Sequence, residues 1–130
     1  MIICDTNILI EFYKNTPKII QELQAIGCKR IAISAITQAE LYFGAFDKVE
    51  LRKIKEHLSL MTVLPLTNNI SDRFLELMEI YCLSHKLSLP DALIAATSLI
   101  HKYELYTLNQ KDFRFIQEML LYQPITYISI

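Results

Sequence analysis

The sequence contains few of the residues that long irregular regions need, because only two of its 130 residues are glycine and four are proline. It is 52% hydrophobic and 21% charged, which is unlike a disordered chain and sufficient for a hydrophobic core. We therefore expect residues 1–130 to form one domain.

Long hydrophobic runs are also absent. No stretch approaches the roughly 20 apolar residues that span a bilayer, and the first residues lack the basic start and apolar stretch of a signal peptide. Three scattered cysteines, Cys4, Cys28 and Cys82, have no paired spacing, which argues against a disulfide framework or a structural zinc site. These absences predict a cytoplasmic protein that does not contact a membrane.

An excess of positive charge is missing as well, since the formal net charge is −1. This argues against strong, non-specific binding of nucleic acid by the bare protein. An enzyme that acts on nucleic acid stays compatible with this charge, because bound cations and local basic patches can hold a polyanion.

Short apolar runs alternate with segments of helical periodicity along the chain. The pattern predicts strands over residues 1–4, 31–33, 62–64, 105–108 and, at an edge, 125–130. It predicts helices over residues 7–13, 17–26, 47–61, 70–86 and 90–102, one that ends near Gly44, and a weak one over 112–121. Strands separated by helices indicate an α/β protein with a parallel sheet of four to five strands, covered on both faces.

Acidic residues follow these predicted strands. Asp5 comes directly after the first strand, and Glu40 lies in the helix after the second. Asp91 is in the first turn of the helix before the fourth strand, which Asn109 and Asp112 follow. In parallel sheets ligands bind beyond the carboxyl ends of the strands. Clustered carboxylates repel one another, and a bound divalent cation is the simplest way to offset this repulsion. Oxygen ligands favour Mg²⁺ or Mn²⁺. Either ion can activate water and stabilise negative charge on a phosphate.

Each acid also has a purely structural interpretation. Asp5 could cap the following helix, and Asp91 could complement a helix dipole. Thr37 and Glu40 fit a capping box, and the polar residues after the fourth strand could be turn residues. These interpretations explain the residues one at a time. They do not explain why the acids follow successive strands of one sheet.

Four segments, in order and at suitable intervals, resemble the PIN-domain nucleases and most closely their VapC-type toxins. They are Asp5-Thr6-Asn7, residues 34–41, residues 89–97 (the most specific) and residues 106–113. The resemblance implies a three-layer α/β/α fold and cleavage of single-stranded RNA, with transfer RNA as one candidate. It also implies a cognate antitoxin protein and a homodimer.

The same resemblance implies roles for individual residues. Asp5, Glu40 and Asp91 take the positions of the metal-binding acids. Asn109 occupies the position of a fourth ligand, and Asp112 lies three residues further on, which leaves one metal ion or two as alternatives. Residues expected to orient ligands or water are Thr6, Asn7 and Thr107. Apart from the resemblance, Lys111 and Arg114 are candidates for phosphate contact because they adjoin Asn109 in the sequence.

Other functions receive less support. A phosphatase of the haloacid-dehalogenase type needs a second acid two residues after the first, where this chain has Asn7. A receiver-like signalling domain needs an acid pair after the first strand, which is absent. A catalytically inactive PIN-like protein that binds RNA or another protein stays open as the alternative function.

Overall fold

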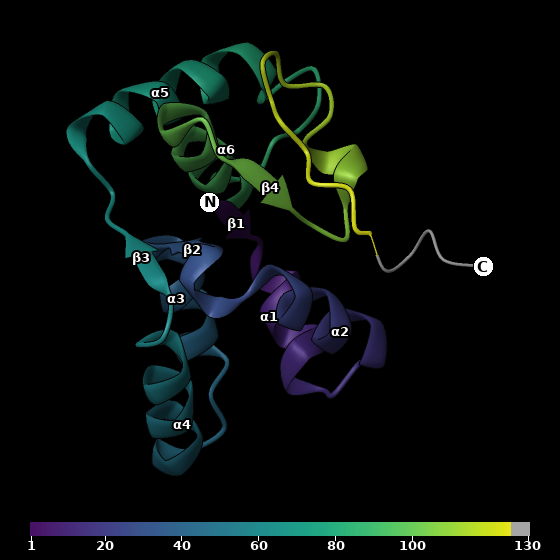
Figure 1. Ribbon diagram of the computed structural model, residues 1–130. Helices are drawn as coiled ribbons and strands as arrows, with labels where there is room; N and C mark the ends of the chain where they lie inside the picture. The colour runs from purple at the N-terminus through teal and green to yellow at the C-terminus, as the bar shows by residue number, and fades with distance from the viewer. Residues whose placement is uncertain (126–130) are drawn as a thin grey trace.

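A computed structural model describes residues 1–125 and shows a four-stranded parallel sheet with helices on both faces (Figure 1). The strands are β1 (Ile2–Cys4), β2 (Ile31–Ser34), β3 (Thr62–Leu64) and β4 (Glu104–Tyr106), in the order β3-β2-β1-β4. The helices are α1 (Thr6–Tyr13), α2 (Pro17–Ile26), α3 (Ala35–Phe43), α4 (Lys48–Leu58), α5 (Asn68–Tyr81) and α6 (Leu89–His101). The predicted three-layer α/β/α architecture is confirmed.

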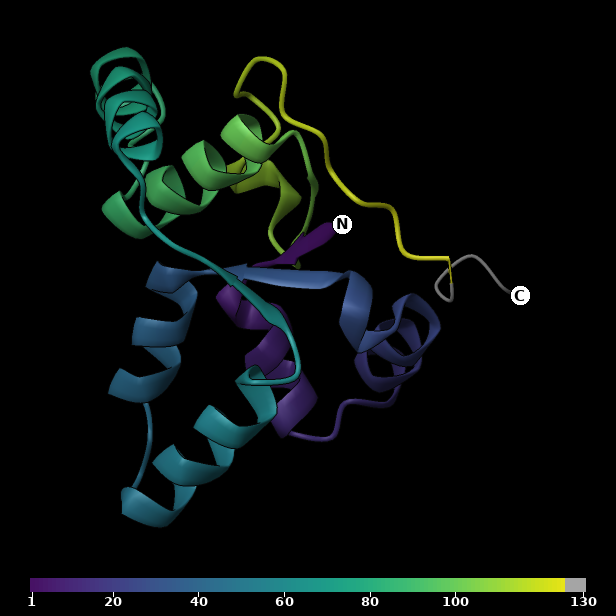
Figure 2. The same ribbon diagram turned by 60° about the vertical axis from the view of Figure 1, so that its left-hand side comes forward.

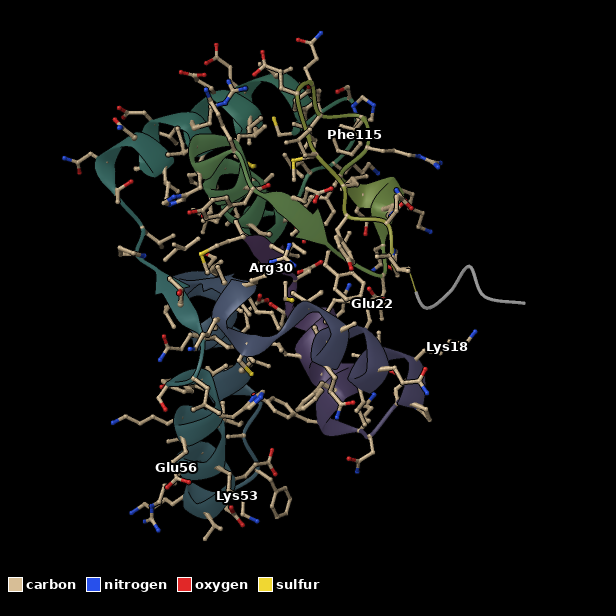
Figure 3. The ribbon with its side chains drawn as sticks, in the orientation of Figure 1. Lys18, Glu22, Arg30, Lys53, Glu56 and Phe115 are labelled. Atoms are coloured by element: carbon tan, nitrogen blue, oxygen red, sulfur yellow. The ribbon has the colours of Figure 1, made fainter. Side chains whose placement is uncertain are left out.

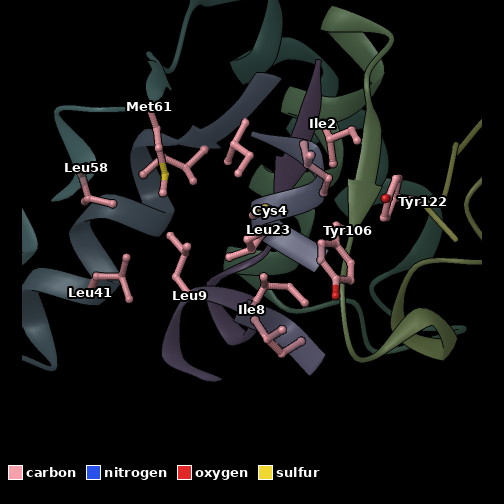
Figure 4. Close-up of a cluster of buried hydrophobic side chains, with 14 of the residues drawn as sticks. Ile2, Cys4, Ile8, Leu9, Leu23, Leu41, Leu58, Met61, Tyr106 and Tyr122 are labelled. Atoms are coloured by element: carbon pink, nitrogen blue, oxygen red, sulfur yellow. The ribbon is translucent and has the colours of Figure 1, made fainter. Parts of the chain in front are cut away.

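Alternation along the strands divides the core between the two faces of the sheet. Ile2 and Cys4 of β1 belong to one buried cluster, which Figure 4 shows together with side chains of α1, α2 and α4. Ile3 belongs to the other cluster, which α5 and α6 cover. Figure 2 shows these two helices on one side of the sheet, and α1, α2 and α4 on the other. Because both faces are buried, the central strand β1 is continuously apolar and fully buried, whereas β3 and β4 each begin with an exposed polar residue.

The strand order creates a topological switch point next to β1. From β1 the chain adds β2 and then β3 on one side, whereas β4 pairs with β1 on its other side. The carboxyl ends of β1 and β4 are therefore neighbours, with Cys4 paired to Tyr106. In open parallel sheets this is where ligand sites form.

The region after β4 departs from the prediction. Residues 112–121 do not form a helix; a short 3₁₀ turn, η2 (Gln110–Asp112), is followed by turns, and Glu118 has a left-handed φ of 68°. Leu121 instead forms a parallel bridge with Leu105. Burial of Phe113 and Ile116 together with this bridge outweighs the weak helical periodicity. The predicted strand over 125–130 lies mostly outside the described residues, and Ile125 itself is in a bend.

Three further differences are smaller. α5 ends at Tyr81, five residues before the predicted end, and α4 ends at Leu58, three residues before it. β4 ends at Tyr106 rather than at residue 108. Within residues 1–125, no helix is both long enough and apolar enough to cross a membrane.

Candidate active site

Asp5 lies at the switch point and is held there by two donors. It caps α1, and its Oδ1 accepts a hydrogen bond from the backbone N–H of Thr6 at 2.7 Å. Its Oδ2 accepts from the hydroxyl of Thr107, directly after β4, at 2.8 Å. The capping role considered from the sequence is thus present, yet a cap does not need a second donor from a distant strand. The carboxylate is 5% exposed and fixed in orientation.

Glu40 reaches the same region from α3. Its Oε1 accepts a hydrogen bond from the Thr6 hydroxyl at 2.7 Å, and this hydroxyl is also 3.1 Å from the hydroxyl of Thr37. Thr6 has a single hydroxyl proton, so both contacts coexist only when Thr37 donates to Thr6. The capping-box interpretation of Glu40 is wrong, because α3 begins after Ser34, whose hydroxyl accepts from the N–H of Ile36.

Asp91 is placed by the start of α6. Ser88 is the N-cap of this helix, and its hydroxyl accepts a hydrogen bond from the backbone N–H of Asp91 at 3.3 Å. The Asp91 side chain is half-buried in the first helical turn, where the helix dipole favours a negative charge. Asp91 therefore complements the dipole of α6, as considered from the sequence, and it also lies near the other acids.

The segment after β4 closes the site. The Asn7 amide nitrogen is 3.4 Å from the Thr107 hydroxyl, and the Asn7 carbonyl oxygen accepts from the N–H of Leu108 at 3.3 Å. The N–H of Asn109 donates to the Thr107 hydroxyl at 3.1 Å. Thr107 therefore links this segment to Asp5, and η2 then carries Asp112.

The charges of four acids influence one another. Burial raises the pKa of Asp5, the two hydrogen bonds lower it, and the charges of Glu40 and Asp112 raise it further. The pKa of Asp91 is raised to about 6, first by burial and then by the charges of Asp5, Asp112 and Glu40, while a hydrogen bond with Ser88 lowers it. The four carboxyl groups thus form one cluster of negative charge. Asp112 belongs to this cluster through its charge, whereas Asn109 adjoins it through its backbone.

The donor chemistry of this acidic cluster suits a hard divalent cation, because all four groups offer carboxylate oxygens. Across residues 1–125, however, no three acidic, imidazole or thiol side chains are already close enough together to chelate one ion. The carboxylates interact at longer range. A bound ion would have to draw them inwards.

The structure adds residues that the sequence did not indicate. Thr37 supports the Thr6–Glu40 contact, and Ser88 starts the helix that presents Asp91. The pattern Ser88-Leu-Pro-Asp91 is a helix-start signal that could have revealed Ser88, whereas the local pattern at Thr37 indicated only a capping box and not its contact with Thr6. Lys111 lines a hollow beside Asp91 and Asp112. The other candidate for phosphate contact, Arg114, is exposed outside the lining of that hollow.

Comparison with known proteins identifies the family to which the chain belongs. The family model described as PIN domain matches residues 2–117, so the chain belongs to the PIN-domain family. A toxin–antitoxin complex from Klebsiella pneumoniae contains a chain that is 34% identical, with a TM-score of 0.80, 96% of this chain covered and 100% of that one.

Two VapBC structures are also similar. VapBC2 from Rickettsia felis, bound to a DNA fragment from its promoter, contains a chain that is 26% identical, with a TM-score of 0.80. The match covers 94% of this chain and 98% of that one. VapBC-1 from nontypeable Haemophilus influenzae contains a chain that is 29% identical, with a TM-score of 0.79. The match covers 95% of this chain and 98% of that one. No curated protein matches the sequence. Within the PIN-domain family the chain is of the VapC type, a family of toxin nucleases.

Proposed function

We propose that this protein is a metal-dependent endoribonuclease that cleaves single-stranded RNA with metal-activated water, as the toxin of a toxin–antitoxin pair. The observation that carries the proposal is the acidic cluster at the switch point: Asp5, Glu40, Asp91 and Asp112 come from separate segments and interact through their charges. Four interacting carboxylates raise the energy of the cation-free protein. These carboxylates therefore destabilise the fold when no cation is bound, whereas together they offer ligands to a cation.

We assign the metal ligands to Asp5, Glu40 and Asp91. Asn109 and Asp112 are alternatives for a fourth ligand, and the charge coupling of Asp112 to Asp5 and Asp91 supports Asp112. Mg²⁺ or Mn²⁺ at such a site supplies charge neutralisation, activation of water and stabilisation of the scissile phosphate.

The protein's own residues prepare this site by fixing the direction of its carboxylates. The N–H of Thr6 donates to Oδ1 of Asp5, and the hydroxyl of Thr107 donates to Oδ2. Each carboxylate oxygen keeps a further lone pair that can bind a cation. The Thr6 hydroxyl holds Glu40 in the same way. Asn7 braces Thr107, so these polar groups act as positioning residues that reduce the cost of assembling the ligands.

An apolar cavity with exposed aromatic side chains nearby suits the binding of a partner protein. A cavity of about 550 Å³ between α1, α3 and α4 has Glu40 in its lining, next to apolar groups of Ile10 and Leu41. Phe43 and Phe46 nearby are 94% and 88% exposed. Aromatic side chains are enriched in the centres of protein interfaces. We propose that an antitoxin covers this apolar surface and inhibits the enzyme by blocking access to Glu40.

The remaining proposals concern the protein as a whole. Residues 1–130 act as a single nuclease domain, which forms a homodimer in the cytoplasm. Transfer RNA is one candidate substrate. These proposals follow from the resemblance to VapC-type toxins, and the similar toxin–antitoxin and VapBC complexes support the antitoxin partner alone.

The test is cleavage of a mixed RNA pool by purified protein with Mn²⁺, with excess chelator, and with Asp5→Asn. We expect cutting that requires the metal and is absent in the variant. No cutting together with no Mn²⁺ binding would instead support the non-catalytic alternative, an RNA- or protein-binding PIN-like module. Direct measurement of Mn²⁺ binding by calorimetry separates that outcome from a narrow substrate preference.

A further inference from the structure

A second hollow borders the acidic cluster on the side opposite the apolar cavity. Its volume is about 320 Å³, and Asp91 and Asp112 form part of its lining. The remaining lining includes His85 and Lys86, from the connection between α5 and α6, and Lys111 of η2. A ligand in this hollow would lie directly beside the carboxylates proposed to bind metal.

An aromatic stack forms one wall of the hollow. The His85 ring lies on the Phe115 ring with their centroids 4.1 Å apart and an angle of 10° between their planes. Tyr81 is 5.1 Å from Phe115 and 5.6 Å from His85, at steep angles to both, so it lies beside the stack and not above it. Figure 3 shows Phe115 where the segment after β4 passes the end of α5.

The described ring contacts of His85 are with Phe115 and Tyr81. Phe115 covers one face of the imidazole, Tyr81 lies at the side, and the His85 residue is exposed. A flat, exposed ring backed by a second ring is the kind of surface on which nucleic-acid bases stack.

Two cations accompany the stack. Lys86 follows His85 directly and has a left-handed φ of 52°, and the next residue, Leu87, is buried. Lys111 also lines the hollow, and it comes from η2, a segment distant in sequence from Lys86. An aromatic platform next to basic side chains is the combination that single-stranded nucleic-acid sites use for bases and phosphates.

We propose that this hollow is a nucleotide subsite, in which one base of single-stranded RNA next to the cleaved bond stacks on His85 while Lys86 and Lys111 contact its phosphate. The inference rests on the proposed ribonuclease function and adds a binding residue, His85, and a cation, Lys86. The stacked rings provide affinity that does not depend on which base is present, since every base has a flat face.

The test is equilibrium binding of two fluorescein-labelled probes by fluorescence anisotropy, in an Asp5→Asn background with Mg²⁺ present. One probe is a random single-stranded RNA octanucleotide, and the other is a ribose-phosphate chain of the same length without bases. The proteins are the parent, His85→Ala, His85→Phe, Lys86→Gln and Lys102→Gln. Lys102 is a matched control, because it is an exposed lysine with a φ of 57° that lines a different hollow.

We expect His85→Ala to weaken binding of the RNA about fivefold or more, leave the base-free probe unchanged, and be rescued by His85→Phe. Lys86→Gln should weaken binding of both probes and lower the slope of log affinity against log salt by about 0.7, whereas Lys102→Gln should not. Equal effects of the two lysine variants, or equal loss of both probes in His85→Ala, would overturn the subsite. A parent protein that binds neither probe would contradict the RNA substrate itself.

Discussion

The two halves of the acidic cluster are built differently. In the fixed half, Asp5 and Glu40 accept hydrogen bonds from side chains that come from different segments of the chain. In the open half, Asp91 and Asp112 are half-buried and border a hollow. The fixed half has its geometry determined by these hydrogen bonds, whereas the open half has half-buried carboxylates at the edge of a hollow. The pKa is raised in both halves, at Asp5 and at Asp91.

This difference suggests a division of roles. Orientation by hydroxyl groups lowers the cost of binding an ion at Asp5 and Glu40. In the proposed ribonuclease, the hollow beside Asp91 and Asp112 would allow RNA to reach an ion held between the halves. Changes to the open half should therefore remove activity with little structural cost, and changes around the fixed half should weaken metal binding in proportion to the contact that is lost.

The largest effect is expected in the open half. Asp91→Asn should keep the fold, because asparagine is tolerated at the start of a helix, and should reduce RNA cleavage by about 10³-fold, since a metal ligand is lost. Asp47→Asn is a matched control: Asp47 also lies at a helix start, where it caps α4 through the N–H of Glu50. Cleavage assays and circular dichroism check both variants. Full activity in a folded Asp91→Asn protein would remove this residue from the mechanism.

In the fixed half, Thr107→Val removes the hydroxyl that donates to Asp5 while keeping the shape of the side chain. We expect Mn²⁺ affinity to fall about 10- to 100-fold, as is typical when a partner of a metal ligand is removed. Thr97→Val is the control, because Thr97 is equally buried but donates to the carbonyl of Leu93 within α6. Isothermal titration with Mn²⁺ compares the two. Equal affinities would show that Thr107 stabilises the fold without preparing the site.

A smaller effect is expected for Thr6→Val. It removes the hydroxyl bond to Glu40 but leaves the N–H of Thr6 that donates to Asp5. One of the two oriented carboxylates thus keeps its donors, and we expect Mn²⁺ affinity to fall about tenfold, at the lower end of the range for such partners. The Thr6→Val and Thr107→Val double variant should show whether the two effects add. Additivity would mean that Asp5 and Glu40 are oriented independently.

The sequence was a good guide wherever a feature depends on local pattern. The strands ending before Asp5 and Asn109 could be predicted because buried parallel strands are short apolar runs, and the helix after Pro17 because proline favours a first turn. The turns over 113–121 could not be predicted, since they depend on burial of Phe113 and on pairing of Leu121 with Leu105.

The nearness of Asp5 and Asp112 was also predictable, because they follow β1 and β4, whose carboxyl ends are neighbours. Asp91 does not follow a strand directly, since it lies in the first turn of α6. The supporting contacts of the acids were not predictable. The bond between Asp5 and Thr107 joins residues 102 positions apart, and only the strand order brings them together. The stack of His85 on Phe115 depends on the same non-local arrangement, and neither ring lies in one of the four PIN-like motifs.

The smallest effect is a pH dependence of stability in the metal-free protein. Asp91 has a pKa of about 6 in the folded protein, above its ordinary value of 3.8, so the folded state binds more protons than the unfolded state between these values. Its contribution is therefore fully favourable below about pH 4 and is lost as the pH rises through 6. Because the side chain is only half-buried, we expect a loss of about 1 kcal/mol between pH 5 and pH 8.

Urea unfolding in excess chelator at these two pH values measures this loss, which Asp91→Asn should reduce and added Mg²⁺ should offset. Asp5, whose pKa is also raised, contributes in the same direction and should leave a residual dependence in the variant. If Asp91→Asn shows the same pH dependence as the parent, the open half carries no electrostatic strain. The charge of Asp91 would then give no reason to expect a cation between the two halves.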